Sequence, residues 1–351
     1  MRRTANFELR SSAMLPKVLS ILPRKRFEDA GVCLPAELEF QFEDAVAEPA
    51  IISACRSADF LFLPAAYPSI TRHILENIPS IRMIQSAGTG FDKVDIKSAA
   101  EFNIPVANSP GQNTTTVAEL TIAMLIALQR RILPVDRQIK AGHYASVREE
   151  LFREGLKELG DARLGLVGIG AIGQKVAQVA QLFGARVSYF DIRHPAEDIK
   201  KKLRISYKDF DDLLRSSDAI SLHIPLNDQT RNIIAKREFQ LMPRGALLIN
   251  TARGELVDQQ ALAEALENDH LGGAAVDTVA PEPPPPEHPL LNLSPAARDL
   301  LLITPHIAGT TKGAFNRMLN AALKNIVIVA EGGKPQNVVN GILTAKKPAS
   351  R

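Results

Sequence analysis

Short apolar runs alternate with amphipathic, helix-like segments along most of the chain. The strands expected from this pattern are residues 18–22, 60–63, 82–84, 105–107, 164–167, 187–190, 219–222, 246–250, 273–276 and 301–303. The expected helices are residues 24–30, 51–58, 71–78, 96–102, 116–131, 135–141, 172–183, 210–215, 258–267 and 314–331. Strands that alternate with helices favour parallel sheets covered by helices. The pattern therefore predicts an α/β protein.

The most informative stretch is RLGLVGIGAIGQKVAQVAQLFGARVSYFD, from Arg163 to Asp191. It reads as a buried strand, a GxGxxG turn, a helix with apolar positions on one face, and a second strand that ends at an acid. This order is typical of a dinucleotide-binding unit. A lone GxGxxG would be weak evidence, because glycine-rich turns are common, but here all five parts occur in sequence.

Each glycine of this stretch has a physical role if a dinucleotide binds there. Gly168 would permit the tight turn, Gly170 would let the pyrophosphate approach the backbone, and Gly173 would let the helix pack against the strand. The helix N-terminus offers N–H groups and partial positive charge to the phosphates. Asp191 would accept hydrogen bonds from the adenosine ribose. We therefore expect NAD as the cofactor, with NADP less favoured because the Asp191 carboxylate repels a 2′-phosphate.

Length and composition limit the class of protein. A chain of 351 residues fits two domains of roughly 150 residues each, and the first set of strands is complete before the glycine turn begins. The net charge of +3 does not argue for nucleic acid or a membrane as partner. Cys33 and Cys55, the only cysteines, lack paired spacing, so we expect buried thiols in a reducing, cytoplasmic compartment. We expect no signal peptide, and the apolar stretch 117–128 is too short to span a bilayer.

The expected first domain has a glycine turn of its own, QSAGTGFDKVD, directly after a strand. Backbone N–H groups of such a turn can bind a carboxylate. Standing alone, this motif would more simply be an ordinary turn from a strand to a helix.

Three candidates for chemistry each follow an expected strand of the second domain. Arg253 lies in LLINTARGELVD, Glu282 in AVDTVAPEPPPPEHP and His306 in LITPHIAGTT. Taken singly, each has a simpler interpretation: a loop charge, an exposed acid and a structural histidine. However, the carboxyl ends of parallel strands share one sheet edge, which is also where ligands bind. We therefore expect all three to face the crevice that holds the nicotinamide.

Arginine, glutamate and histidine beside a nicotinamide suit hydride transfer to a 2-keto acid. A guanidinium grips a carboxylate or carbonyl in a forked geometry, and an imidazolium supplies the proton that accompanies the hydride. A neighbouring carboxylate favours the protonated imidazole and orients the ring. The remaining histidines show no metal-ligand spacing, so we expect no metal.

The chain resembles the NAD-dependent D-isomer-specific 2-hydroxyacid dehydrogenases over roughly residues 17–340. The segments that carry the resemblance are SAGTGFDKVD, PVANSPGQNTTTVAELTIAMLIAL, LGLVGIGAIG, SLHIPL, LINTARGELVD, VDTVAPEP and TPHIAG, in the family's order. The resemblance implies two Rossmann-like or flavodoxin-like parallel-sheet domains with a cleft between them. It implies a discontinuous substrate domain (17–115 with 311–340), an NAD-binding domain (116–310), loose termini (1–16 and 341–351), no appended regulatory domain, and a homodimer.

The resemblance also implies roles for individual residues. Arg253 would bind substrate, Glu282 would pair with His306, and His306 would be the acid/base. Thr89 and Gly90 would offer backbone N–H groups to the substrate carboxylate. The further cofactor contacts it implies are Ala171, Ile172, Thr251, Ala252, Asp277, His306 and Gly309.

The loop after the strand expected at residues 60–63 limits the class of substrate, while two alternative functions stay open. The loop after residues 60–63 offers Pro64, Ala65, Ala66 and Tyr67 and no cation, which favours a small unphosphorylated 2-keto acid such as glyoxylate, hydroxypyruvate or pyruvate. A phosphoglycerate dehydrogenase-like activity and a non-catalytic NAD-sensing corepressor on the same fold are the alternatives. Tyr144 stands where the family often has Trp, and the proline run 283–286 is expected to stiffen the loop that carries Glu282. Sequence alone fixes neither the acid nor the physiological direction.

Overall fold

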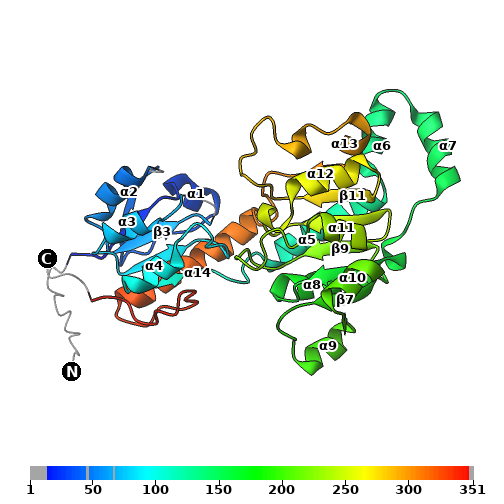
Figure 1. Ribbon diagram of the computed structural model, residues 1–351. Coiled ribbons are helices and arrows are strands. Elements are labelled where there is room, and N and C mark those ends of the chain that lie inside the picture. The colour runs from blue at the N-terminus through cyan, green and yellow to red at the C-terminus, as the bar shows by residue number, and fades with distance from the viewer. Residues whose placement is uncertain (1–13, 45–46, 66–67, 348–351) are drawn as a thin grey trace, which may run out of the picture. The chain divides into compact units, whose positions relative to one another are not determined.

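The computed structural model describes residues 14–44, 47–65 and 68–347 (Figure 1). The chain divides into two compact units, each built on one parallel sheet. The first unit comprises Met1–Asn113 with Lys312–Arg351, and the second comprises Thr114–Thr311. Two parallel-sheet α/β units were predicted, and this fold class is confirmed.

The first unit contains a five-stranded parallel sheet in the order β2-β1-β3-β4-β5. Its strands are β1 (Lys17–Ser20), β2 (Glu39–Phe42), β3 (Phe60–Leu63), β4 (Met83–Ser86) and β5 (Val106–Ala107). Its helices are α1 (Arg24–Asp29), α2 (Glu48–Cys55), α3 (Arg72–Glu76), α4 (Ile96–Glu101) and α14 (Lys312–Ala330).

Helix α14 completes the core of the first unit, although it comes from the far end of the sequence. Its apolar side chains, among them Leu319, Leu323 and Ile326, are buried in one cluster with residues of the β-strands such as Phe60 and Phe62. The opposite face of the sheet packs against α2, α3 and α4 in a second cluster. Both faces of the sheet are therefore covered, as parallel sheets require.

The second unit contains a seven-stranded parallel sheet in the order β12-β11-β10-β9-β6-β7-β8. Its strands are β6 (Arg163–Val167), β7 (Arg186–Phe190), β8 (Ser206–Tyr207), β9 (Ala219–Leu222), β10 (Ala246–Asn250), β11 (Leu271–Val276) and β12 (Leu301–Ile303). Its α-helices are α5 (Thr114–Gln129), α6 (Ile132–Lys140), α7 (Tyr144–Glu154), α8 (Ala171–Leu182), α9 (Glu197–Leu203), α10 (Phe210–Ser216), α11 (Lys236–Leu241), α12 (Gln259–Glu267) and α13 (Pro295–Asp299). Short 3₁₀ turns occur at Leu159–Asp161, Gly254–Leu256 and Pro289–Leu291.

The strand order of the second unit creates a site for a ligand. The first strand in sequence, β6, lies between β7 on one side and β9 on the other, so successive connections leave it in opposite directions. Helices α5 and α8 cover one face of the sheet, and α10, α11 and α12 cover the other. A crevice for ligands is expected outside the carboxyl ends of β6 and β9, where the connections diverge.

Several elements were not predicted from the sequence. Strand β2 alternates Phe40 and Phe42 with polar residues but is only four residues long, and α7 is largely polar. The two-residue β8 and the helices α9, α11 and α13 are too short to show a clear apolar period. Among the described residues, no helix has the length and apolar character needed to cross a membrane.

The two cysteines and the C-terminal segment differ in part from what the sequence predicted. Cys55 is buried, and burial raises the pKa of its thiol to about 12, but Cys33 is exposed rather than buried as expected. In the expected loose tail, the carbonyl of Lys346 accepts a hydrogen bond of 3.1 Å from the guanidinium of Arg82. Residues 1–13 and 348–351 of the two expected loose termini lie outside the described residues.

Candidate active site

The glycine turn between β6 and α8 has the geometry that a dinucleotide needs. Gly168 has a φ of 100°, and a Cβ there would lie 2.6 Å from the carbonyl oxygen of His223. A Cβ on Gly173 would lie 2.2 Å from the carbonyl oxygen of Gly168, so helix and turn could not pack as they do. A Cβ on Gly170, in contrast, would meet no atom within 4 Å. Two glycines are thus required by packing, while the third leaves open space where a pyrophosphate would approach α8, which begins with Ala171 and Ile172.

Asp191 lies next to this turn because β6 and β7 are adjacent and in register. One oxygen of its carboxylate accepts from the backbone N–H of Ile169 at 2.8 Å, and the other accepts from that of Arg193 at 2.9 Å. These bonds fix the orientation of the carboxylate at the end of β7. A carboxylate accepts more than one hydrogen bond per oxygen, so capacity remains for ribose hydroxyls.

His306 and Glu282 are in contact. Nδ1 of His306 lies 3.0 Å from Oε2 of Glu282, and both side chains are about one-third exposed (32% and 39%). Because a carboxylate oxygen only accepts, Nδ1 is the nitrogen that carries the hydrogen in this pair. Nε2 therefore remains as the atom that can exchange a proton with a ligand.

The loop that carries His306 is fastened by Asp277, which follows β11. Asp277 is fully buried, and its carboxylate accepts from the hydroxyl of Thr304 at 2.6 Å and from the backbone N–H groups of Ile307 and Ala308 at 2.8 Å. The carbonyl of Asp277 also accepts from the N–H of His306 at 2.7 Å. His306 has a φ of 55°, a conformation that is uncommon outside glycine and that surrounding structure must hold in place.

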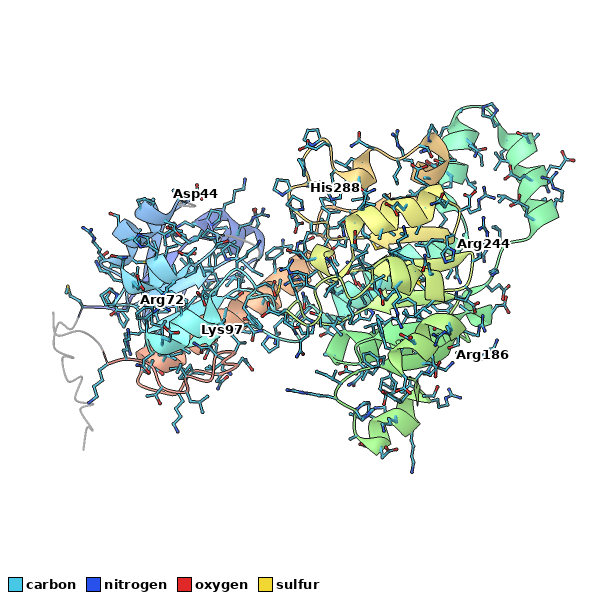
Figure 2. All side chains as sticks on the ribbon, in the orientation of Figure 1. Asp44, Arg72, Lys97, Arg186, Arg244 and His288 are labelled. Carbon is cyan, nitrogen blue, oxygen red and sulfur yellow. The ribbon has the colours of Figure 1, made fainter. Side chains whose placement is uncertain are left out.

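Glu282 lies in the proline-rich loop that follows β11. The imidazole of His288, whose position in the unit is labelled in Figure 2, is buried and lies with Nε2 3.1 Å from the carbonyl of Ala280. The backbone N–H of His288 also donates to the carbonyl of Pro285 at 3.0 Å. His288 therefore closes the loop on itself, which restricts the position of Glu282.

Arg253 follows β10 and is half-buried. Its Nη1 donates to the carbonyl of Ala252 at 2.8 Å, and its own carbonyl accepts from Nδ2 of Asn250 at 2.7 Å. Asn250 also accepts from the N–H of Ala252 at 3.0 Å, so one buried amide shapes the whole turn. Thr251 is buried, and its hydroxyl lies 2.9 Å from that of Thr121. Asn250 was missed in the sequence, although a polar residue at the end of a buried strand was a usable signal.

The structure thus places most of the expected residues at one edge of the second sheet. The expected residues that lie at or just beyond the carboxyl ends of its strands are Gly168, Asp191, Arg253, Asp277, Glu282, His306 and Gly309. Thr89 and Gly90 belong to the first unit, in the loop after β4. There the carbonyl of Gly90 accepts from the hydroxyl of Ser86 at 2.7 Å, and the carbonyl of Thr89 accepts from Nδ2 of Asn108 at 2.7 Å.

His223 is a second residue that the sequence did not single out. It follows β9, beside the glycine turn, and its Nε2 lies 2.9 Å from the hydroxyl of Ser221. Desolvation lowers the pKa of its imidazole to about 3, so the ring is neutral near pH 7. The feature of the sequence that could have identified His223 is its place in SLHIPL, directly after a strand. Within the described part of the chain, no group of three or more His, Cys, Asp or Glu side chains could hold a metal ion.

A parallel sheet with this glycine turn, acid and His–Glu pair defines a nicotinamide-dependent dehydrogenase. Residues 122–308 match the family model described as D-isomer specific 2-hydroxyacid dehydrogenase, NAD binding domain. The chain belongs to this family and is an NAD-dependent oxidoreductase, as the motifs predicted.

Similar proteins cover most of the chain. A glyoxylate reductase of Aeropyrum pernix is 36% identical over 83% of this chain and 85% of its own length. A D-3-phosphoglycerate dehydrogenase of Methanocaldococcus jannaschii is 32% identical over 89% of this chain but only 57% of its own length. Among solved structures, D-lactate dehydrogenase from Aquifex aeolicus, in complex with NAD and lactic acid, has a TM-score of 0.77. It is 26% identical and is matched over 90% of this chain and 96% of its own.

Proposed function

We propose that this enzyme interconverts a small unphosphorylated 2-keto acid and its D-2-hydroxy acid, with glyoxylate, hydroxypyruvate and pyruvate as the substrate type. The observation that carries the proposal is the pairing of His306 with Glu282 at 3.0 Å. A residue that exchanges protons with a substrate is needed for turnover, whereas a protein that only senses NAD has no use for one. Relatives named glyoxylate reductase and glycerate dehydrogenase support this substrate class.

In this proposal His306 is the acid/base. During reduction Nε2 donates a proton to the carbonyl oxygen of the keto acid, and during oxidation it takes the proton from the hydroxyl. Glu282 accepts the hydrogen of Nδ1, which fixes the orientation of the ring and leaves Nε2 toward the substrate. The buried carboxylate of Asp277 holds the loop so that this pair forms.

Arg253 and the turn at Thr89 and Gly90 bind the substrate. The guanidinium of Arg253 supplies forked hydrogen bonds to the carboxylate and carbonyl of the keto acid. The N–H groups of Thr89 and Gly90 supply further donors to the same carboxylate. These residues determine that a 2-keto acid, rather than a simple ketone, is the substrate.

NAD binds along the glycine turn, and in its reduced form it supplies the hydride. Gly168, Gly170 and Gly173 shape the turn, Ala171 and Ile172 meet the pyrophosphate, and Asp191 accepts from the ribose hydroxyls. The remaining contacts to the nicotinamide half are assigned to Thr251, Ala252, Asp277, His306 and Gly309.

A phosphorylated substrate is the alternative, because relatives include D-3-phosphoglycerate dehydrogenases. A phosphate carrying nearly two negative charges would need cations in the loop after β3. Pro64 and Ala65 supply none, and Ala66 and Tyr67 lie outside the described residues. Arg72, the nearest arginine in sequence, donates to Glu76 at 3.0 Å and to Glu101 at 2.6 Å, which favours a structural role for it.

We also propose that the enzyme is a cytoplasmic homodimer that associates through the second unit. Helices α6 and α7 carry apolar side chains that the monomer leaves exposed, including Leu133, Tyr144 and Phe152 at 48%, 61% and 72%. Exposed apolar surface of this kind is typical of a contact with another chain. Sedimentation equilibrium with the wild-type protein and with Phe152→Ser tests this assembly.

The function is tested by a screen of 2-keto acids with NADH and with NADPH, following absorbance of the reduced cofactor. We expect the highest kcat/KM with a two- or three-carbon keto acid, and chiral analysis of the product should give the D isomer. A much higher kcat/KM for phosphohydroxypyruvate than for hydroxypyruvate would overturn the substrate assignment. Binding of NADH without turnover of any keto acid would favour the sensing corepressor instead.

A further inference from the structure

The second unit has a cavity at the edge of its sheet opposite to the glycine turn. It has a volume of about 550 Å³ and lies where β6, β7 and β8 begin and where α8 ends. Its lining residues with charged or polar side chains are Arg163, Gln181, Arg186, Ser188, Arg204, Ser206, Lys208, Ser216 and Ser217. A cavity of this size suits a small molecule.

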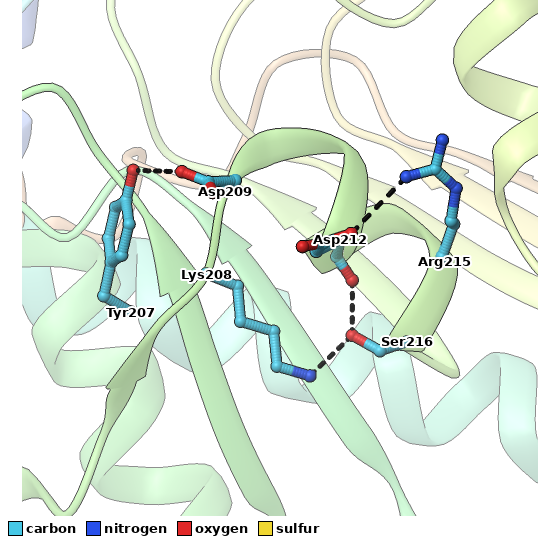
Figure 3. A pocket seen from close by; sticks show the side chains of 6 residues that line it. All are labelled: Tyr207, Lys208, Asp209, Asp212, Arg215 and Ser216. Atoms are coloured by element: carbon cyan, nitrogen blue, oxygen red, sulfur yellow. Dashed lines mark hydrogen bonds and ion pairs between the residues drawn. The ribbon is translucent and has the colours of Figure 1, made fainter.

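All four charged residues that line this cavity are cations. Arg163 is neutralised by Asp218, to which it donates two side-chain hydrogen bonds of 2.7 and 3.0 Å. In the described parts of the chain, the side chains of Arg186 and Arg204 form no ion pair, and Nζ of Lys208 donates to the hydroxyl of Ser216 at 2.6 Å (Figure 3). Arg186 and Arg204 are exposed and Lys208 is half-buried, so three positive charges line one cavity that has no carboxylate among its lining residues, and their combined potential attracts an anion.

Among the neutral polar groups of the cavity, the hydroxyls of Ser216 and Ser217 already donate to the carbonyls of Asp212 and Leu213, which leaves Ser188, Ser206 and Gln181 as possible donors. The hydroxyls of Ser188 and Ser206 lie 3.1 Å apart across β7 and β8, and Nε2 of Gln181 donates to the carbonyl of Arg204 at 3.3 Å. Hydroxyl and guanidinium donors together match the oxygens of a phosphate.

The adjoining pocket shows a contrasting composition. It shares Lys208 and Ser216, but Asp209 and Asp212 also line it, and Asp212 pairs with Arg215 (Figure 3). Carboxylates therefore offset the positive charge in the adjoining pocket, whereas no carboxylate lines the cavity of about 550 Å³. This difference locates the anion on the Arg186 and Arg204 side of Lys208.

We propose that this cavity binds a small anion that carries one or two phosphate groups, at a site separate from the cofactor. β6 runs from Arg163, at the cavity, to Val167 beside the glycine turn, and β7 runs from Arg186 to Phe190 beside Asp191. The two sites are therefore at opposite ends of the same strands. The proposal does not depend on which keto acid the enzyme reduces.

The test is calorimetric titration of the intact enzyme with pyrophosphate and inorganic phosphate, at constant ionic strength. Saturating NADH is present throughout, so that the phosphate site of the glycine turn is filled. Arg186→Gln and Arg204→Gln are each compared with Arg244→Gln, an exposed arginine that precedes β10 and does not line the cavity (Figure 2). Arg253→Gln is the control for binding at the proposed substrate site, and thermal unfolding of each variant verifies its fold.

We expect pyrophosphate to bind the wild-type enzyme, and Arg186→Gln and Arg204→Gln each to weaken it by about three- to tenfold. Arg244→Gln and Arg253→Gln should bind it as the wild type does. No binding to the wild type would refute the site, and so would equal weakening in all three surface variants, which would indicate a general charge effect. Loss of binding in Arg253→Gln would place the anion at the substrate site instead, and equal affinity for malonate would overturn the phosphate class.

Discussion

The buried carboxylate of Asp277 accepts a hydrogen bond of 2.8 Å from the backbone N–H of Ala308, two residues after the proposed acid/base. Asp277→Asn replaces one acceptor oxygen by an amide that donates, so at least one bond to the His306 loop is lost. We expect kcat to fall by up to about 100-fold, because small misplacements of a reacting group have effects of this size. The dissociation constant for NADH, measured by fluorescence, should change much less. A large loss of NADH affinity with kcat preserved would show that Asp277 acts mainly through its proposed nicotinamide contact and not by holding the His306 loop.

His306→Ala should lower kcat by about 10²–10⁴-fold, the usual contribution of a general acid. NADH binding should be nearly unchanged, because the glycine turn and Asp191 are intact. Stopped-flow measurement of the hydride-transfer step with the preferred keto acid checks this prediction. A variant that retains wild-type kcat would rule out His306 as the proton donor.

Glu282→Gln should lower kcat, but less than His306→Ala does. The carboxylate 3.0 Å from Nδ1 of His306 fixes the orientation of the ring, and a misplaced ring delivers its proton less efficiently. We expect a loss of about tenfold in kcat with little change in NADH affinity. Glu287→Gln, in the same loop but exposed, is the matched control. An unchanged kcat in Glu282→Gln would contradict the pairing.

Asp191 should make NADH the preferred cofactor. Its carboxylate is fixed by Ile169 and Arg193 and would repel the 2′-phosphate of NADPH. We expect kcat/KM to be higher with NADH, and Asp191→Ser to reduce this preference by about tenfold or more. If the wild-type enzyme were equally efficient with NADPH, the role of Asp191 in selectivity would be disproved.

His223 should make the folded state less stable in acid. Its pKa is lowered from 6.5 to about 3 in the folded protein, so between these values the unfolded chain binds the extra proton. The free energy of unfolding therefore rises with pH in this window, by at most about 1.4 kcal/mol per pH unit from this one group. Thermal unfolding of His223→Gln should show a shallower dependence of Tm on pH than the wild type, with His270→Gln as a control. An unchanged slope would show that His223 is not the responsible group.

The sequence was most informative where a residue's role depends on its place after a strand. Arg253, Glu282 and His306 could be assigned to one sheet edge because each follows an apolar run, and parallel strands present their carboxyl ends together. The glycine turn and Asp191 could be predicted equally well, since their spacing reflects one strand–helix–strand unit.

Features that depend on contacts between distant residues could not be predicted in this way. Asp277 fastens the His306 loop through hydrogen bonds to residues 27 to 31 positions further along the chain, and its place in the sequence does not show which groups it will meet. Two cations of the proposed anion site, Arg186 and Arg204, are about twenty residues apart and meet only because β7 and β8 are neighbours. Strand β2 was missed although Phe40 and Phe42 alternate with polar residues, because four residues are too few for this pattern to stand out.

The position of helix α14 has a consequence for biosynthesis. The first unit cannot cover one face of its sheet until residues 312–330 have left the ribosome, because that helix supplies Leu319, Leu323 and Ile326 to the core. Domains usually fold in the order in which they are translated. Here the second unit is complete in sequence at Thr311, before the first unit receives its last helix. The nascent chain therefore carries a sheet face that only α1 covers while the second unit is synthesised, and the first unit completes its core after the second unit has been translated.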